Sequence, residues 1–439
     1  MDSNQPLEVD ILFKGGTVVT MDANLNVIPN AALAVKGEKI AWISSAEGSP
    51  GCVNASKVID TRGKVIVPGF INTHSHIAMS LFRGLVDDHP LAEWLDKVLV
   101  YEKKYTSPEN VVTGAQLAMI EMIRSGTTCV ADMYWQFEYT TEAARKANFR
   151  MVNGPSFTFI TGYGGVQPAD EITALDYLER YAQDTLIQCC VQVHSTYTSH
   201  PEMLARAREL SERFGVVFIT HASESRAEVD QVLKEKGKTP IGVLEQHGLL
   251  GPRTLLAHCV YLDDAEIELL AARSVSVAHC PQSNMKLGSG IARVPDMLAA
   301  GVNVALGTDG PASNNDLDML DEMRSAALLH KGARCDPTVL PARQALAMMT
   351  INAARALGMG DRLGSLEAGK LADVTVLDFD APHLMPCYDV FSHLVYAANR
   401  SDVCTVLING RLVMEDRQLL TLDEDAVKEN VRAIHLGDA

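Results

Sequence analysis

The first residues that could do chemistry are His74 and His76, which form a His-x-His pair. The pair follows a short apolar run at 70–73, a pattern typical of a buried β-strand. Residues two apart on a strand point to the same face, so both imidazoles could bind one metal ion. Taken alone, the pair is also typical of a polar loop. The positions of the other histidines distinguish a metal site from such a loop.

Further potential ligands stand at the ends of similar runs along the chain: His194, His221, His258, His279 and Asp309. Eight such runs alternate with segments whose apolar residues recur three and four positions apart. This is the pattern of strands that alternate with helices. The runs cover residues 70–73, 127–132, 150–153, 188–194, 216–221, 254–258, 274–279 and 302–308.

The alternation predicts an α/β fold, a (β/α)8 TIM barrel over residues 68–366. Helices are expected at 111–123, 173–181, 203–213, 265–272, 294–300 and 320–329. Active sites of TIM barrels lie at the C-terminal ends of the strands. We therefore expect the strand-end histidines and Asp309 to face one mouth, although the sequence assigns no role to His279.

Both ends of the chain are rich in short strands. Strand-like runs occur at 10–13, 17–20, 31–35 and 40–43, with a turn signal at Gly15-Gly16, and again at 65–67, 372–377 and 403–408. Asn409-Gly410 predicts a type I′ hairpin into a strand at 411–414. We expect residues 1–67 and 367–439, the latter including a C-terminal tail, to build one small β-sandwich beside the barrel.

The charge balance argues against two classes of partner. The 439 residues include 38 Lys+Arg and 55 Asp+Glu, a formal net charge of −17. Such a chain is not expected to bind nucleic acid or an anionic membrane surface. The sequence shows no apolar run of membrane-spanning length and no secretory signal, and its nine scattered cysteines lack a Cys-x-x-Cys pair. These features favour a cytoplasmic protein with reduced cysteines.

The most plausible ligand set is His74, His76, His221 and Asp309. Three imidazoles and a carboxylate without a thiolate suit zinc, and also iron or manganese. A metal ion in an open site lowers the pKa of a bound water to about 7 and so supplies hydroxide at neutral pH. The run at 188–194 holds no lysine that could be carboxylated to bridge two metals. We therefore expect one divalent ion.

Two more side chains could act on protons or charge. Glu224 follows His221 in the sequence His-Ala-Ser-Glu and could carry a proton from the water to a substrate nitrogen. His258 could stabilise charge on the attacking oxygen. The structural alternatives are a solvated loop residue or helix-capping partner for Glu224 and a satisfied strand-end histidine for His258. The His-x-Glu and Pro-Cys-x-x-Cys pattern of the other zinc deaminases is absent.

These motifs resemble those of the amidohydrolase superfamily, over nearly the whole chain. Within it, the sequence is most similar to the methylthioadenosine/S-adenosylhomocysteine deaminases, near the triazine hydrolases and chlorohydrolases. The superfamily motifs lie at 68–76, 221–224, 257–259, 307–310 and 366–373, and the subgroup motifs at 81–84, 93–95, 283–290 and 312–315.

The resemblance implies roles for individual residues. Glu224 would pass a proton to the ring nitrogen of an aminopurine, while His258 and Asp309 would activate or hold the hydroxide. The substrate-binding residues would be Trp94, Glu102, His194, Glu224, Asp309 and Ser313. Within this set His194 would bond the purine, Trp94 would pack on the ligand and Glu102 would bind the ribose hydroxyls. The last assignment requires a one-residue deletion after Trp94, since Lys103 occupies the ungapped position. Trp94 could instead be an apolar anchor on a lid helix.

The resemblance implies a homo-oligomer, a dimer or a tetramer, and an adenosine-type substrate. Members that take S-adenosylhomocysteine hold its carboxylate with arginines near the loop after the third strand. Here residues 153–171 contain no Lys or Arg. This favours 5′-methylthioadenosine or adenosine, deaminated to an inosine-type product with release of ammonia. The alternatives are a free aminated base or a triazine as substrate, displacement of an aromatic halide, and a homologue without catalysis.

Overall fold

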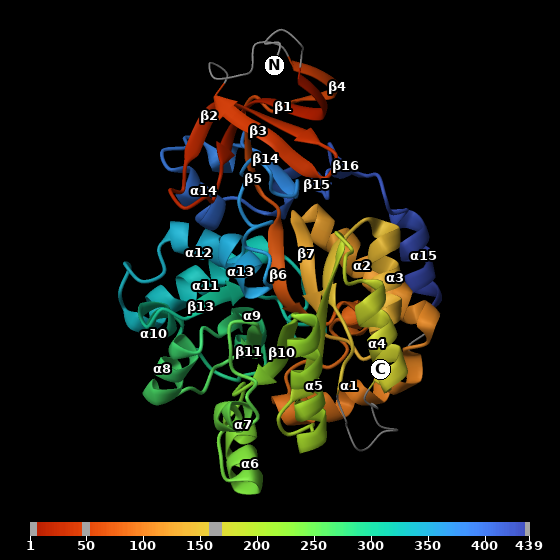
Figure 1. The fold of residues 1–439 in the computed structure, drawn as a ribbon. Helices are drawn as coiled ribbons and strands as arrows, with labels where there is room; N and C mark the ends of the chain where they lie inside the picture. Colours follow the sequence, from red (N-terminus) through yellow and green to blue (C-terminus); the bar gives the residue numbers. More distant parts are fainter. Residues whose placement is uncertain (1–6, 46–52, 158–168, 435–439) are drawn as a thin grey trace.

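The structure is a computed structural model that describes residues 7–45, 53–157 and 169–434. Two sheets organise the chain (Figure 1): an eight-stranded parallel sheet below and a nine-stranded mixed sheet above it. The lower sheet forms the predicted barrel and the upper one gathers strands from both ends of the chain. The predicted fold class is thus confirmed.

The barrel strands follow one another in chain order. They are β6 (Phe70–Ser75), β7 (Thr127–Asp132), β8 (Arg150–Asn153), β9 (Ile187–Ser195), β10 (Val217–Ala222), β11 (Thr254–His258), β12 (Ser276–His279) and β13 (Asn303–Leu306). Hydrogen bonds close the barrel between its ends, because the Asp309 N–H donates to the His74 carbonyl (2.9 Å) and Thr73 Oγ1 to the Leu306 carbonyl (2.8 Å). The first and last strands therefore bring their C-terminal residues together.

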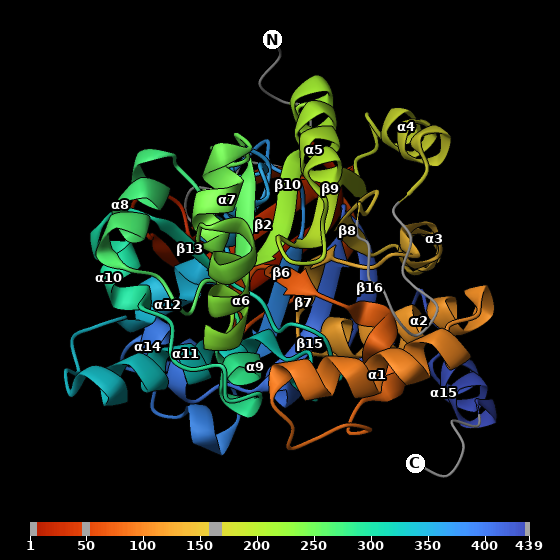
Figure 2. The ribbon, with the colours of Figure 1, turned by 90° about the horizontal axis from the view of Figure 1, so that it is seen from below.

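Helices surround these strands (Figure 2) and bury their apolar faces against them. They are α2 (Pro108–Arg124), α3 (Phe137–Ala147), α4 (Glu171–Arg180), α5 (Pro201–Phe214), α6 (Arg226–Lys236), α7 (Pro240–Gln246), α8 (Asp264–Ala272), α9 (Pro281–Lys286), α10 (Val294–Ala299), α11 (Met319–Arg334), α12 (Ala342–Met348) and α13 (Ile351–Ala356). The six helices expected from apolar periodicity are all present.

One helix stands apart from this layer and matters most for the site. After β6 the chain forms the 3-10 helix η2 (Ile77–Phe82) and then α1 (Leu91–Tyr105). Figure 2 shows α1 beside the ends of β6 and β7. Its buried residues Trp94, Val98 and Glu102 recur at helical spacing and face the barrel. The helix expected around Trp94 is therefore present, and its role as a lid stays a prediction.

The upper sheet joins the two ends of the chain. Its strands are β1 (Leu7–Val19), β2 (Val27–Lys36), β3 (Lys39–Ser45), β4 (Val53–Asp60), β5 (Lys64–Pro68), β14 (Val374–Asp378), β15 (Val403–Ile408), β16 (Arg411–Glu415) and β17 (Gln418–Leu419). The junction is the antiparallel pair β5–β14. The predicted composite β-module is present, with hydrogen bonds joining its described strands into one sheet.

Two glycine signals had different outcomes. Asn409 and Gly410 both have positive φ (52° and 75°) between β15 and β16, as a type I′ hairpin requires. Gly15-Gly16, by contrast, does not make the predicted turn. β1 runs through it as one strand with register shifts against β2, and Gly15 has φ of 94°. A glycine bulge uses the same backbone freedom as a turn, which explains the error.

A buried ion pair fastens the barrel to the upper sheet. Arg150 of β8 donates from Nε to Asp373 Oδ2 (2.7 Å) and from Nη2 to Asp373 Oδ1 (2.8 Å). Nη2 also donates to Asn409 Oδ1 (2.9 Å), and Arg150 is 1% exposed. The two parts of the chain thus share one desolvated polar network.

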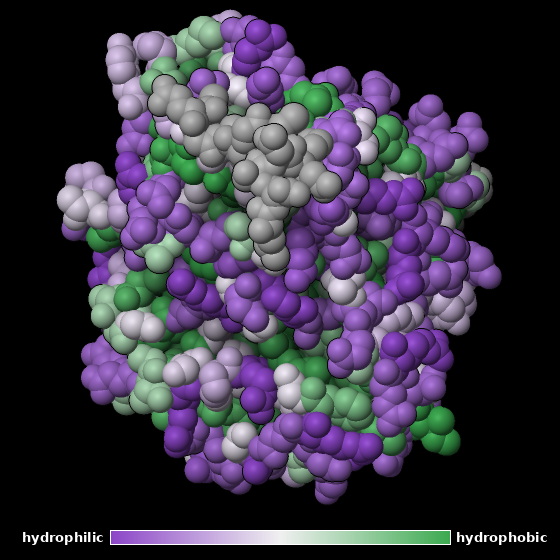
Figure 3. Space-filling model, turned by 45° about the horizontal axis from the view of Figure 1, so that its top comes forward, coloured by the Kyte–Doolittle hydropathy of each residue, from purple (hydrophilic) through white to green (hydrophobic). Residues whose placement is uncertain are grey.

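The remaining elements cover the outside. These are η3 (Pro382–Leu384), α14 (Val390–Tyr396), η4 (Arg400–Asp402) and α15 (Glu424–Ala433). Arg124 of α2 donates to Glu424, which places α15 against the barrel wall (Figure 1). In the described part of the chain, no helix is both long and apolar enough to cross a membrane. Hydrophilic side chains cover most of the face in Figure 3.

Candidate metal centre and active-site pocket

Five potential ligands meet where the barrel closes. His74 lies near the end of β6 and His221 near the end of β10. His76 directly follows β6, and Asp309 lies three residues after the end of β13. Asp309 Oδ1 lies 3.5 Å from His74 Nε2 and 3.3 Å from His76 Nε2. The ring centroids of His74 and His221 are 4.7 Å apart. The four residues predicted as ligands are therefore neighbours.

His258 belongs to the same cluster. Ligand atoms of His74, His221, His258 and Asp309 all lie within 4.8 Å of one another, and these residues are buried. This group of four contains His258, which the sequence assigned to catalysis, and leaves out His76, which it assigned to the metal. The choice of His76 as the third imidazole ligand stays a prediction, because five donors compete for one centre.

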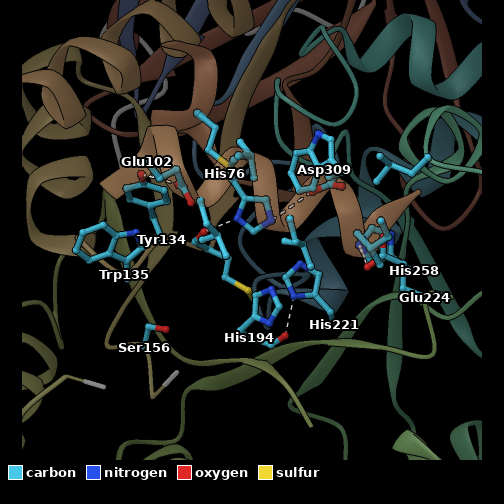
Figure 4. A pocket seen from close by; sticks show the side chains of 18 of the residues that line it. His76, Glu102, Tyr134, Trp135, Ser156, His194, His221, Glu224, His258 and Asp309 are labelled. Atoms are coloured by element: carbon cyan, nitrogen blue, oxygen red, sulfur yellow. Dashed lines mark hydrogen bonds and ion pairs between the residues drawn. The ribbon is translucent and has the colours of Figure 1, made fainter. Parts of the chain in front are cut away.

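Hydrogen bonds at Nδ1 fix the orientation of three of the imidazoles. Nδ1 of His76 donates to the Met133 carbonyl (2.5 Å), and Nδ1 of His221 donates to the His194 carbonyl (2.6 Å). Nδ1 of His258 lies 2.9 Å from Asn284 Oδ1. Because these oxygens are partners of Nδ1, each ring presents its Nε2 to the cluster. Figure 4 shows His76, His221 and Asp309 around a common space.

The residues present fit a metal ion. Both ring nitrogens of His74 and Nε2 of His258 are buried without a hydrogen-bond partner. Leaving a buried polar atom unpaired costs about 1–3 kcal/mol, so such atoms in a native site require an explanation. Burial lowers the pKa of His74 to about 4 and so keeps its imidazole neutral. Neutral imidazoles beside a carboxylate are the donors that zinc takes.

Two serines hold Asp309 from the side away from His74. Oδ2 of Asp309 accepts from Ser283 Oγ (2.6 Å) and Ser313 Oγ (2.8 Å). Ser313 was expected to bind substrate, but it is not among the described residues that line the pocket. Its direct contact with substrate stays a prediction, whereas its bond to Asp309 is a feature of the structure.

A pocket with a mostly apolar wall opens in front of the cluster. An apolar wall with a few converging polar groups is typical of small-molecule sites. Helix α1 supplies Leu91, Trp94, Leu95, Val98, Leu99 and Glu102. The strand ends supply Met133, His194 and four members of the ligand cluster, His76, His221, His258 and Asp309. Three predicted substrate-binding residues, Trp94, Glu102 and His194, thus line one pocket together with Glu224.

Glu224 faces this pocket from the loop after β10. It is 6% exposed, and its Oε2 lies 3.7 Å from His258 Nε2. Burial raises the pKa of Glu224 well above its usual range, and the nearby charges of Asp309 and Glu228 add to this effect. A carboxyl in this environment can hold and give a proton. The alternative of a solvated loop residue is therefore excluded.

Glu102 stands at another side of the pocket, near Tyr134 and Trp135 (Figure 4). It is 7% exposed, and its Oε1 accepts from the Tyr134 hydroxyl (2.9 Å). Lys103, the residue in the ungapped alignment, is exposed. The geometry favours the alignment with a deletion after Trp94.

The expectation for His279 was wrong. Its Nε2 lies 3.0 Å from Nε2 of His330 on α11, and it is not among the described residues that line the pocket. Val277, two residues earlier, packs in the cluster between strands and helices. Residues two apart share a face, so alternation along β12 directs His279 to the helix layer.

The sequence reasoning missed the supports behind the cluster, among them Asn284 behind His258 and Glu228 behind Glu224. Asn284 carried no signal beyond the subgroup motif at 283–290. Glu228 carried one: Ser225-Arg226-Ala227-Glu228 is the Ser-x-x-Glu pattern of a helix start. Ser225 is the N-cap residue of α6, as that pattern predicts.

Comparisons with known proteins find relatives that match nearly the whole chain. A relative from Syntrophobacter fumaroxidans, a 5-methylthioadenosine/S-adenosylhomocysteine deaminase, is 47% identical over 427 residues, 97% of each chain. A 5′-deoxyadenosine deaminase from Methanosarcina acetivorans is 42% identical over 96% of this chain and 97% of its own. The crystal structure of an adenosine deaminase from Xanthomonas campestris with bound zinc superimposes with a TM-score of 0.93 at 34% identity and covers 98% of both chains.

A model of the amidohydrolase family matches residues 65–413, a span that runs from β5 to β16 and contains every residue of the cluster. The resemblance inferred from the motifs is thereby confirmed. This chain belongs to the amidohydrolase family.

Proposed function

We propose that the protein is a metal-dependent hydrolytic deaminase of an adenosine-type nucleoside, with 5′-methylthioadenosine as the preferred substrate. One observation carries the proposal. A single pocket is lined by Glu224 and four of the five clustered ligands on one side and by the buried carboxylate Glu102 on another. Such a pocket offers separate partners to the amine-bearing ring and to the sugar of a nucleoside. The names of the relatives support the same substrate class.

His74, His76, His221 and Asp309 would hold one divalent ion, zinc, which the Xanthomonas campestris structure contains. A divalent ion at such a site acts as a Lewis acid and makes water a nucleophile near neutral pH. Burial opposes the ionisation of Asp309, but the neighbouring imidazoles of His74 and His76 lower the pKa of its carboxyl well below the usual range, so it is suited to bind a cation.

Glu224 would deliver a proton to the ring nitrogen next to the carbon that bears the amine. The reaction adds water to that carbon, protonates the ring nitrogen and expels ammonia. His258 lies 3.7 Å from Glu224 and would stabilise charge on the oxygen that adds to the ring. His194 would hold the purine, since its ring lines the same pocket.

The charges in the pocket favour an uncharged 5′ group. Its described lining contains no Lys or Arg, and its one acid outside the metal-side cluster is Glu102. A substrate carboxylate would have no cationic partner there and would lie near a like charge. Residues 158–168 lie outside the described residues, but their sequence adds no Lys or Arg. S-adenosylhomocysteine should therefore be a poorer substrate than methylthioadenosine.

The test measures the release of ammonia by zinc-loaded protein from a panel of substrates, and the release of chloride from the chlorotriazine in that panel. The panel contains methylthioadenosine, adenosine, S-adenosylhomocysteine, a free aminated purine, an aminotriazine and a chlorotriazine. The proposal predicts the highest kcat/KM with methylthioadenosine and none of that activity after chelation. Turnover of only the free purine, or only a triazine, would instead support the alternative functions.

We also propose an oligomeric state and a cellular compartment for the protein. The chain forms a homodimer or homotetramer, to be measured by sedimentation. It works in the cytoplasm, which the free state of all eight described cysteines supports.

A further inference from the structure

The loop that carries Glu224 is held from two sides. The Ser223 carbonyl accepts from the N–H groups of Val260 (3.0 Å) and Tyr261 (2.9 Å), which follow β11. On the other side, the carboxylate of Glu228 accepts from the N–H of Glu224 (2.6 Å) and of Ser223 (3.2 Å). The backbone on both sides of the Ser223–Glu224 peptide is therefore fixed by partners outside the loop.

This restraint acts on a strained conformation. Ser223 has φ of 53°, in the left-handed region. A residue other than glycine stays there only when its surroundings hold it. The loop would relax to another conformation without these bonds, and the Glu224 side chain would move with it.

Burying the carboxylate of Glu228 costs more free energy than an exposed helix-capping residue would. It lies in the first turn of α6 and is 5% exposed. Burial raises its pKa, and the backbone N–H groups of Glu224, Ser223 and Ser225 counter that effect. In a capping box the acid accepts from the N–H of the N-cap residue itself. Glu228 also reaches past the N-cap Ser225 and accepts from the N–H groups of the two residues before it.

We propose that Glu228 is a positioning residue for the reaction, which aims the Glu224 carboxyl at the substrate ring through its bonds to the Ser223 and Glu224 N–H groups. The inference rests on the proposed function, in which Glu224 carries the proton. It goes beyond it by assigning a role to a side chain that does not line the pocket.

The chain contains a matched control. Glu266 of α8 occupies the corresponding position after the N-cap residue Asp263 and accepts from the Asp263 N–H (3.1 Å) in a true capping box. It is not among the described residues that line the pocket. Replacing Glu266 by Gln perturbs the same kind of bond at a helix start, together with a bond that Glu266 accepts from Thr239 Oγ1 (2.6 Å), without touching the Glu224 loop.

The experiment compares Glu228→Gln and Glu266→Gln in the zinc-loaded full chain with methylthioadenosine. The amide of the first variant keeps the shape but offers an N–H to one of the two backbone donors. We expect its kcat to fall by about 10- to 100-fold, with KM within about twofold of the wild type, because small misplacements of a reacting group cost this much. Zinc content and Tm should match those of Glu266→Gln, whose kcat should stay at the wild-type value.

A second readout does not depend on turnover. Amide hydrogen exchange of the peptide that contains residues 222–225 should become faster in Glu228→Gln and stay unchanged in Glu266→Gln. Unchanged exchange, an unchanged kcat, or a KM that rises in step with the loss of kcat would each overturn the proposal. If the wild type itself releases no ammonia, the proposed function fails, and faster exchange alone then tells whether Glu228 holds the loop.

Discussion

At the scale of the residue, strand-end histidines were visible in the sequence because each follows an apolar run. The cluster His74, His221 and Asp309 could be predicted on that basis. The exact ligand set could not be predicted, because His76, which follows β6, and His258, at the end of β11, both lie beside the same cluster. His258 has φ of 72°, so its backbone departs from strand geometry at the last residue of β11. No sequence pattern reports such a turn.

The ligand set predicts different results for two matched substitutions. His76→Asn should weaken zinc binding by at least about 100-fold, since second-shell changes alone cost 10- to 100-fold. His258→Asn should keep one zinc per chain and lose about 100-fold or more in kcat, as removal of one charge-stabilising donor does. Chelator competition followed by steady-state kinetics measures both. Loss of zinc in His258→Asn with full binding in His76→Asn would exchange the two roles.

At the scale of the element, apolar periodicity located strands and helices well, because each has one face in the core. The face of the strand on which each histidine lies was predicted less well. Along β10 the alternation holds, and His221 shares the inner face with Ile219. Along β12 the same rule points His279 outward, and applying it would have removed that residue from the site. The Gly15-Gly16 error has another origin, since a bulge and a turn both need glycine.

Helix α1 brings Glu102 and Trp94 into the pocket. The proposed bond between Glu102 and the ribose hydroxyls can be tested with substrates that lack those hydroxyls. Glu102→Gln should lower kcat/KM for methylthioadenosine by about 10- to 100-fold, because a hydrogen bond to a charged group contributes about 1.5–3 kcal/mol. The 2′,3′-dideoxy analogue should already show that loss with the wild type and lose little more with the variant. Equal further losses for both nucleosides would mean that Glu102 supports the lid helix rather than the ribose.

At the scale of the whole molecule, the buried pair Arg150–Asp373 joins the barrel to the sheet built from both chain ends. The sequence predicted both parts but not this joint, because its residues lie 223 positions apart. Contacts of that kind depend on the finished fold. They leave no local periodicity in the chain.

Removing one partner of the Arg150–Asp373 ion pair should destabilise the protein more than replacing both partners by apolar residues. Asp373→Leu leaves the Arg150 guanidinium buried and unpaired, which should cost about 3–5 kcal/mol of unfolding free energy. The double variant Arg150→Met/Asp373→Leu should recover much of that loss, since an apolar pair of similar volume avoids the desolvation penalty. Urea unfolding of the zinc-loaded variants measures both. A double variant less stable than Asp373→Leu would contradict this account of the joint.

The central claim is that one buried carboxyl, Glu224, carries the proton in a zinc-dependent deamination of a nucleoside. The most direct measurement is ammonia release from methylthioadenosine by wild type and Glu224→Gln, each with its zinc content determined. We predict turnover by the wild type and a kcat lower by about 100- to 10,000-fold in the variant, the usual contribution of general acid–base catalysis, at equal zinc. Equal turnover by the two proteins, or none by a folded zinc-loaded wild type, would contradict the account.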